Sequence, residues 1–194
     1  MDRIQLLAQL AKYNTPFLEE ADFIPRFISL ISNFPNCFDR SLITGHITAS
    51  AWIVDSFSES ALLIHHKKLD RWLQPGGHTD GNEDTLSTAC REAHEETGIS
   101  TLVVYSSSIF DLDIHLIPAR EKIQAHLHYD IRYLCVADRH ESLLNSHEIN
   151  ELAWLPLDSI GDYTDNSISI NRMVQKTRII FNKSNQFMQP IHGL

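Results

Sequence analysis

The segment from residue 77 to residue 99 constrains the fold of this chain more than any other. Residues 84–97 have the spacing of an amphipathic α-helix, with glutamates on roughly the side opposite to the apolar stripe. Like charges three or four residues apart on a helix repel, so this face is either solvated or neutralised by a bound cation. Carboxylates on a rigid helix suit Mg²⁺ or Mn²⁺. The stripe comprises Leu86, Ala89, Cys90 and Ala93, and the acidic side comprises Glu92, Glu95 and Glu96.

The periodicity of the remaining chain predicts an α/β fold. Two-residue alternation or apolar runs between turn signals predict strands at 46–55, 61–65, 101–111 and 126–136. Helical spacing predicts a helix over 166–182. Strands mixed with helices in this order favour a sheet covered on both faces.

Residues 1–40 read as an N-terminal helical extension that precedes a domain at 41–194. Helical spacing begins at residue 3, and a second apolar helical run follows, interrupted by Pro25, which favours two short helices with a kink. The extension is more apolar than a solvated arm requires. We therefore expect it to pack on its own domain or on a second subunit, which makes a homodimer a reasonable expectation.

Composition limits the classes of partner. The chain has 194 residues with 16 Lys+Arg against 25 Asp+Glu, a formal charge of −9, which argues against a broad surface for nucleic acid or an anionic membrane. No apolar run approaches the about 20 residues that span a bilayer, and the three cysteines have no disulfide or zinc spacing. These features predict a cytoplasmic protein, and an anionic substrate would need positive charge supplied locally.

Within residues 77–99 the sequence resembles the signature of the Nudix hydrolases, G-x5-E-x7-R-E-U-x-E-E-x-G-U, where U is aliphatic. Every spacing is intact, and the one departure is an alanine where a larger aliphatic residue is usual. The resemblance extends from about residue 43 to 160. The matching positions are Gly77, Glu83, Arg91, Glu92, Ala93, Glu95, Glu96, Gly98 and Ile99.

The resemblance implies a Nudix-type α/β/α sandwich with a mixed β-sheet and a metal-dependent hydrolysis of a diphosphate linkage. Bound Mg²⁺ or Mn²⁺ would make the site locally cationic on an acidic protein. Carried over by position, the roles are metal ligands for Glu92, Glu95, Glu96 and the Gly76 carbonyl, an auxiliary ligand or structural acid for Glu83, and a carboxylate orienter for Arg91.

The base that deprotonates the attacking water varies in position within this family. Glu148 and Glu151, in or after the loop that follows the 126–136 strand, are the candidates in this chain. A salt bridge at a loop or at the edge of the core is the alternative role for each.

Eleven histidines raise the question of whether some converge on a site. Alternation places every second residue of the 126–136 strand on one face, and an upstream stretch is similarly rich in His and Asp. We hypothesise that these side chains line the pocket, where they bind substrate phosphate or ribose or hold an additional metal; a solvated edge strand is the alternative. His78, directly after Gly77, is a further candidate for phosphate contact. The pocket candidates are Asp113, His115, His126, His128 and Asp130.

Three functions remain open at the level of sequence. The first is hydrolysis of a nucleoside diphosphate derivative of the ADP-ribose or nucleotide-sugar type, releasing a nucleoside monophosphate and a phosphorylated moiety. The second is a house-cleaning nucleoside triphosphate pyrophosphohydrolase. The third is a catalytically silent nucleotide-binding module, against which the intact acidic set argues.

Overall fold

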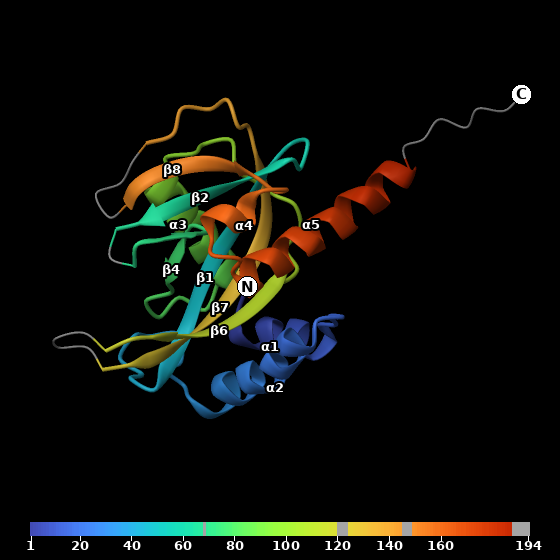
Figure 1. Ribbon diagram of the computed structural model, residues 1–194. Coiled ribbons are helices and arrows are strands. Elements are labelled where there is room, and N and C mark those ends of the chain that lie inside the picture. Colours follow the sequence, from blue (N-terminus) through green and yellow to red (C-terminus); the bar gives the residue numbers. More distant parts are fainter. Residues whose placement is uncertain (68, 120–123, 145–148, 188–194) are drawn as a thin grey trace, which may run out of the picture.

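The computed structural model describes residues 1–67, 69–119, 124–144 and 149–187, with the side chains of the last helix described as far as residue 182. Among these residues, two helices precede the strands, one helix lies between the first four strands and the last four, and two helices follow them (Figure 1). The helices are α1 (Arg3–Lys12), α2 (Leu18–Asn33), α3 (Thr85–Thr97), α4 (Ile160–Tyr163) and α5 (Ile168–Phe187). The strands are β1 (Gly45–Asp55), β2 (Ser60–His66), β3 (Arg71–Leu73), β4 (Gly76–His78), β5 (Val103–Val104), β6 (Asp111–Ile117), β7 (His126–Ala137) and β8 (Ile149–Pro156).

The described strands form one mixed sheet around β1 and β7, which run parallel along the whole of β1. All the other pairings are antiparallel. Along one edge, β1 pairs first with β4 and then with β2. This arrangement places the short strand β4 beside the first half of β1, at the point where the chain turns into the signature segment.

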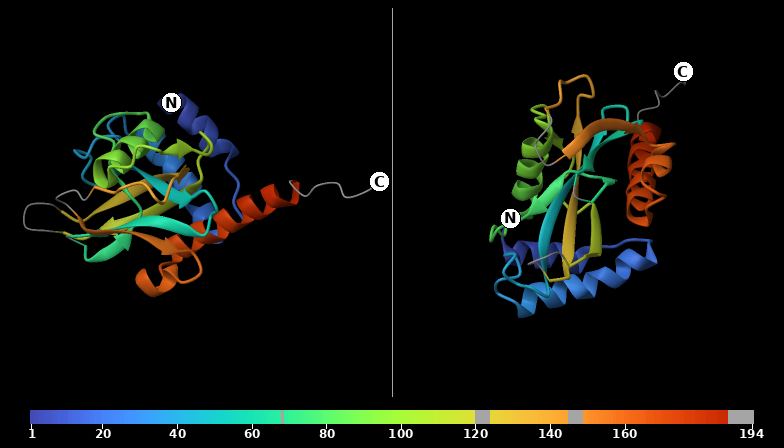
Figure 2. Two further views of the ribbon diagram at one scale, coloured as in Figure 1. Left: turned by 90° about the horizontal axis from the view of Figure 1, so that it is seen from above. Right: turned by 60° about the vertical axis from the view of Figure 1, so that its left-hand side comes forward.

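Helices cover both faces of the sheet, as the sequence predicts (Figure 2). Alternation along β1 sends Ile47 and Ala49 to the face that carries α1, α2 and α3, and sends Trp52 and Val54 to the face covered by α5. The predicted α/β/α sandwich is therefore confirmed. Every residue of β1 is buried, although polar side chains alternate with apolar ones in its first half, at His46, Thr48 and Ser50.

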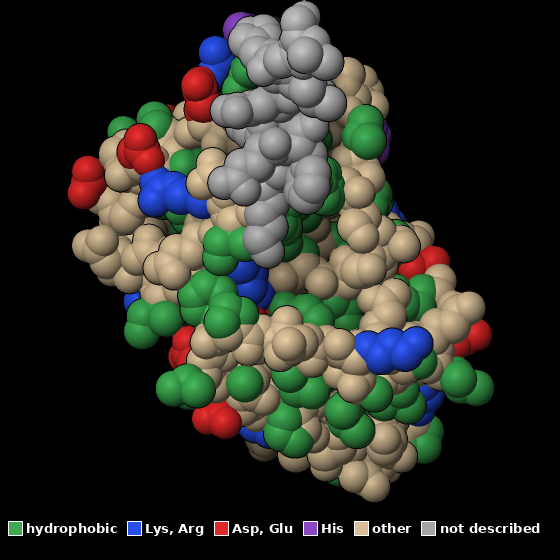
Figure 3. Space-filling view, turned by 90° about the vertical axis from the view of Figure 1, so that its right-hand side faces the viewer, with side chains coloured by type: hydrophobic (Ala, Val, Ile, Leu, Met, Phe, Trp, Pro, Cys, Tyr) green, Lys and Arg blue, Asp and Glu red, His purple; other side chains and the backbone are tan. Residues whose placement is uncertain are grey.

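The N-terminal helices pack on the sheet of their own chain. Leu6 and Leu10 of α1 and Phe27 of α2 are fully buried in one cluster with residues of β1 and β7. The opposite surface of the extension, in the lower half of Figure 3, shows hydrophobic side chains spread among polar groups. The most exposed large apolar side chains of these helices are Ile4 at 77% and Leu18 at 84%.

Two elements differ from the sequence expectation. The second apolar run is one helix that contains Pro25, not two short helices, and its packing face of Phe23, Phe27 and Leu30 is buried on both sides of the proline. The 101–111 strand is wrong as predicted: it reduces to Val103–Val104, because a serine-rich turn separates it from β6. In the described part of the chain, no helix is long and apolar enough to cross a membrane.

Candidate active site

Helix α3 is fixed at both ends and along its buried side. The Asp84 carboxylate caps the first turn by accepting from the Ser87 backbone N–H at 3.1 Å. Gly98 ends the helix in the left-handed conformation at φ 70°, which a glycine adopts without steric cost. Ala89 and Ala93 are fully buried beneath β1, so the glutamate side of the helix is held in a defined orientation.

The backbone of β4 lies in close contact with this acidic side. The Gly76 backbone N–H donates to Glu96 Oε2 at 2.9 Å. A Cβ at Gly77 would lie 2.6 Å from the carboxyl carbon of Glu92, so a larger residue would displace that carboxylate. The backbone of β4 and two of the three glutamates that α3 contributes to the signature therefore meet at one place.

Arg91, for which the resemblance implies the role of carboxylate orienter, contacts two carboxylates of α3. Its guanidinium lies 2.7 Å from Glu92 Oε1 and donates to Glu95 Oε2 at 2.8 Å and to the His78 carbonyl at 3.0 Å. One side chain thus links two glutamates of α3 to the backbone of β4.

The donor set fits a hard divalent cation. Burial raises the pKa of the Glu92 carboxyl, although Arg91 acts in the opposite direction. A half-buried carboxylate whose charge is penalised in this way is one that a bound cation would stabilise. Glu92 and Glu96 are half-buried beside β4, whereas the Glu95 side chain is 55% exposed and turned to Arg91.

Glu83, a predicted auxiliary ligand or structural acid, is engaged by the N-terminal helix. Its carboxylate accepts from the backbone N–H of Arg3 at 3.1 Å and from Arg3 Nε at 3.0 Å. These contacts favour the structural role.

The two candidates for the general base are placed differently. Glu148 lies outside the described residues. Glu151 is an exposed residue of β8 opposite His65 in the ladder with β2. Leu63, two residues before His65, faces α5, so alternation directs Glu151 to the face opposite α3.

The predicted histidines converge, together with one that the sequence interpretation missed. His46 of β1, His78 of β4 and His128 of β7 present ligand atoms that all lie within 4.8 Å of one another. His126 stacks on His46 with ring centroids 5.1 Å apart, and His115 lies 5.5 Å from His128. Burial is the main reason why the pKa of each of three histidines is lowered. The pKa of His46 is lowered, that of His78 falls to about 4, and that of His128 falls to about 2.

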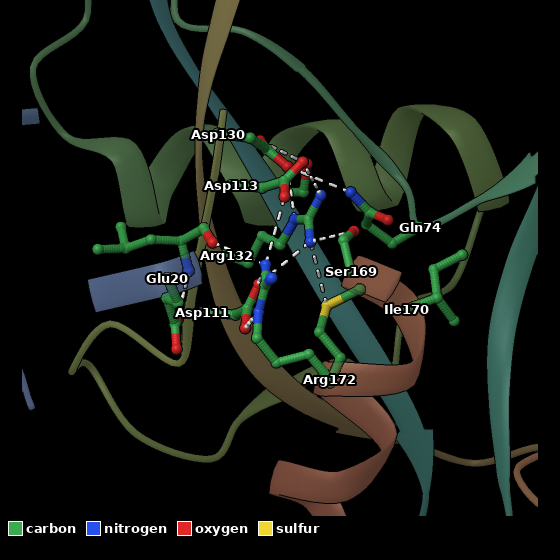
Figure 4. A network of polar contacts seen from close by, with 12 residues as sticks. Glu20, Gln74, Asp111, Asp113, Asp130, Arg132, Ser169, Ile170 and Arg172 are labelled. Carbon is green, nitrogen blue, oxygen red and sulfur yellow. Dashed lines mark hydrogen bonds and ion pairs between the residues drawn. The ribbon is translucent and has the colours of Figure 1, made fainter. Parts of the chain in front are cut away.

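Asp113 and Asp130, both predicted to line the pocket, belong to a buried network of ion pairs (Figure 4). Arg132 bonds Asp130 through Nε at 2.8 Å and lies 3.1 Å from both Asp111 and Asp113. Arg172 of α5 donates to Asp111 at 2.9 Å and lies 3.3 Å from Asp113. These contacts occupy both predicted aspartates and join β6 and β7 to α5.

Around Asp130, the same face includes polar residues that the sequence interpretation did not select. Ser50 and Thr48 donate to Asp130 Oδ1 at 2.8 and 3.0 Å, and Gln74 donates to Oδ2 at 3.2 Å. The alternation of polar residues from His46 onward could have indicated that Thr48 and Ser50 share one face of β1. It could not show that this face lies beside Asp130, because the sequence does not reveal that β1 pairs with β7.

Comparison with known proteins identifies the family of this chain. A family model described as the NUDIX domain matches residues 44–176. A probable DHNTP pyrophosphohydrolase of Lactococcus lactis is 34% identical over 113 residues, which are 57% of this chain and 60% of that protein. The asymmetrical bis(5′-nucleosyl)-tetraphosphatase of the rat is 33% identical over 95 residues, 49% of this chain and 58% of that protein. The similarity thus spans less than two thirds of either relative.

Solved structures share the fold. An Ap4A hydrolase of C. elegans in a binary complex has a TM-score of 0.57 at 20% identity and covers 71% of this chain and 98% of its own. A UDP-X diphosphatase has a TM-score of 0.53 at 17% identity and covers 93% of each chain. The family model covers most of the chain, and Gly77, Arg91 and the α3 glutamates of the signature lie together, so the chain belongs to the Nudix hydrolase family.

Proposed function

We propose that this chain is a metal-dependent pyrophosphohydrolase that cleaves a phosphoanhydride bond of a nucleotide-like substrate. The observation that carries the proposal is the meeting of Glu92 and Glu96 with the backbone of Gly76 and Gly77. Membership of the family and the relatives named as pyrophosphohydrolase and tetraphosphatase support it.

Glu92, Glu95, Glu96 and the Gly76 carbonyl would hold Mg²⁺ or Mn²⁺. When bound, such a cation neutralises phosphate oxygens and lowers the pKa of a bound water. Arg91 keeps Glu92 and Glu95 in place through its paired contacts, so the site keeps its shape when substrate binds. Glu148 and Glu151 stay the predicted proton acceptors, and the placement of Glu151 on the face opposite α3 argues against Glu151.

For the substrate, we favour a chain of three or more phosphates. The name of one relative refers to DHNTP, and that of the other refers to a bis(5′-nucleosyl) tetraphosphate. The name of a solved structure with this fold gives a substrate in full, dihydroneopterin triphosphate. These names support the triphosphate alternative better than the ADP-ribose or nucleotide-sugar type expected first. The UDP-X diphosphatase, at 17% identity, supports the fold alone.

Substrate contacts from His78, His115, His126 and His128 remain a prediction. Turnover by His126→Ala and His128→Ala tests it, and an unchanged kcat/KM in both variants contradicts it. Asp113 and Asp130 are both ion-paired with Arg132, so we propose that their role is to hold the Arg132 side chain in place on this face of the sheet.

The decisive experiment measures Mg²⁺-dependent turnover of nucleoside triphosphates, dihydroneopterin triphosphate, dinucleoside polyphosphates, ADP-ribose and nucleotide sugars. We expect the highest kcat/KM on a substrate with at least three phosphates. Glu92→Gln should lower it at least about 100-fold, because the variant removes charge from the cation site. Glu59→Gln is the matched control, since its side chain is 72% exposed and belongs to the turn between β1 and β2, outside α3 and β4.

Two outcomes would contradict the proposal. Absence of turnover on every substrate, with cation bound, would favour the silent binding module. Equal activity of the Glu92→Gln and Glu59→Gln variants would place the catalytic cation elsewhere. The expected homodimer and cytoplasmic location remain predictions beside this function.

A further inference from the structure

Three imidazoles from three different strands face one another on the side of the sheet opposite α3. His46 of β1 pairs with His128 in the parallel ladder with β7. His78 of β4 pairs with Thr48, which lies two residues after His46 in β1 and on the same face. Their ring centroids are 5.0 to 5.1 Å apart. All three side chains are therefore held by backbone that is itself fixed in the sheet.

Two of these rings have a buried nitrogen with no partner in the described part of the chain. The Nε2 atoms of His46 and His128 are inaccessible to solvent and make no hydrogen bond. His46 is only 2% exposed. An unsatisfied buried polar atom costs about 1–3 kcal/mol, so one explanation is a ligand that these nitrogens bind.

The neighbours of the rings favour Nε2 as a lone-pair donor. His46 Nδ1 lies 3.4 Å from the Leu42 carbonyl, which can only accept, so the proton belongs on Nδ1. His126 Nδ1 lies 2.8 Å from the Gln124 carbonyl, and His115 Nδ1 lies 3.0 Å from Asp113 Oδ2. Metal-binding histidines have this same second contact, in which the other ring nitrogen donates to a carbonyl or carboxylate.

The charge state and spacing of the rings agree with such a role. Burial and the neighbouring imidazoles lower the pKa of both His46 and His128, which favours the neutral form of each ring. Three nitrogens bound to one zinc ion are about 3.3 Å apart, given Zn–N bonds of about 2.0–2.1 Å. The ligand atoms now lie within 4.8 Å of one another, so binding would bring any two of them at most about 1.5 Å closer together.

We propose that His46, His78 and His128 form a binding site for one borderline transition-metal dication, such as Zn²⁺, Ni²⁺ or Co²⁺. Imidazole nitrogens suit these ions, whereas Mg²⁺ prefers the oxygen ligands of α3. Three protein ligands leave a coordination position open, with His115 and His126 beside it.

The site is separate from the proposed catalytic cation and does not depend on the proposed function. Gly77 faces α3 and the next residue, His78, faces the opposite side of the sheet. A metal ion there would join β1, β4 and β7, and would thereby hold the strand that presents the two glycines to the glutamates.

The test uses the full chain without an affinity tag, stripped of metal and then equilibrated with Zn²⁺ in excess Mg²⁺. Zinc per chain is measured by mass spectrometry after gel filtration, and we expect about one equivalent. His46→Gln and His128→Gln should each lower the zinc content at least tenfold, with circular dichroism reporting whether each variant folds. His140→Gln is the control, because this exposed histidine follows the far end of β7.

A second measurement does not depend on variants. Co²⁺ bound to the wild-type chain should give the intense visible absorption of a four-coordinate ion, and Glu92→Gln should leave that spectrum unchanged. Zinc that excess Mg²⁺ displaces, zinc that Glu92→Gln removes, or a six-coordinate Co²⁺ spectrum would each overturn the proposal.

Discussion

At the level of single residues, the position of β4 between β1 and α3 depends on the absence of two side chains. Gly76 has no room for a Cβ, which would lie 2.7 Å from the Cα of Ser50. Gly77 has room only if the Glu92 carboxylate moves. A side chain at Gly76 would clash with backbone, which cannot move easily, whereas a side chain at Gly77 would only displace the Glu92 carboxylate. A substitution at Gly77 therefore tests the position of Glu92 without unfolding the chain.

Gly77→Ala should lower kcat/KM by about 100-fold with little loss of stability. The added methyl group pushes the mobile end of Glu92 aside, and a shift of about 1 Å in a catalytic group has an effect of this order. Steady-state kinetics and thermal unfolding measure the two quantities. Gly81→Ala provides the contrast, because at φ 86° with open space around it the substitution strains the backbone but displaces nothing. Wild-type kinetics in Gly77→Ala would show that the Glu92 position is unimportant.

The lowered pKa of His128 predicts a loss of stability in mild acid. Its pKa is about 2 in the folded chain and about 6.5 when unfolded. Between these values the unfolded state binds the extra proton, so the free energy of unfolding falls as the pH falls below about 6.5. In metal-free protein, His128→Gln should reduce this slope by at most about 1.4 kcal/mol per pH unit. Urea unfolding between neutral pH and mild acid checks it, with His140→Gln expected to keep the wild-type slope.

At the level of elements, the first helix stabilises the loop that leads into α3. Arg3, in the first turn of α1, bonds Glu83 through both its backbone and its side chain. Glu83 directly precedes the residue that caps α3. The helical extension therefore contributes to the position of the catalytic helix, a connection that sequence periodicity does not reveal.

A double-mutant cycle of Arg3→Ala and Glu83→Gln should give a coupling of about 0.5–1 kcal/mol in the free energy of unfolding. The pair is partly exposed, which keeps the interaction small. If Glu83 has the structural role, Arg3→Ala and Glu83→Gln should have similar effects on the Mg²⁺ dependence of turnover. A much larger increase in the Mg²⁺ requirement for Glu83→Gln alone would restore its role as an auxiliary ligand.

The elements also show where periodicity is a sufficient guide. The signature helix is predicted at 84–97 and found at Thr85–Thr97, because its cap, apolar stripe and terminal glycine are all local. The 101–111 strand fails because hydrogen bonding within the serine turn competes with the sheet ladder. The interrupted second helix stays whole because tertiary packing outweighs the missing N–H of Pro25.

At the level of the whole molecule, one charged network connects the two sides of the fold. Arg172 of α5 contacts Asp111 and Asp113 of β6 and reaches Glu19 of α2 at 3.2 Å. Lys176 joins Asp111 to Glu20 at the same place. The charges are nearly all buried, so each depends on the presence of its partners.

Arg172→Met should therefore lower the free energy of unfolding by about 3–5 kcal/mol, because it leaves buried carboxylates without part of their compensation. Chemical denaturation of the metal-free protein gives this value. Arg178→Met, on the exposed part of the same helix, removes a surface pair with Asp158 and should cost less than about 1 kcal/mol. Equal costs for the two variants would mean that the network contributes no more than a surface salt bridge.

The sequence alone determined the features that depend on neighbours within a few turns of chain. The acidic face of α3, the glycines before it, the alternation of β7 and the family itself all follow from such short-range spacing. Only the tertiary structure decided what faces these elements. His46 meets His128, and Asp113 meets Arg132 and Arg172, because β1 and β7 pair in parallel and α5 packs across β6 and β7. Strand order and register arise from burial over the whole sheet, so contacts between distant segments cannot be read from local period.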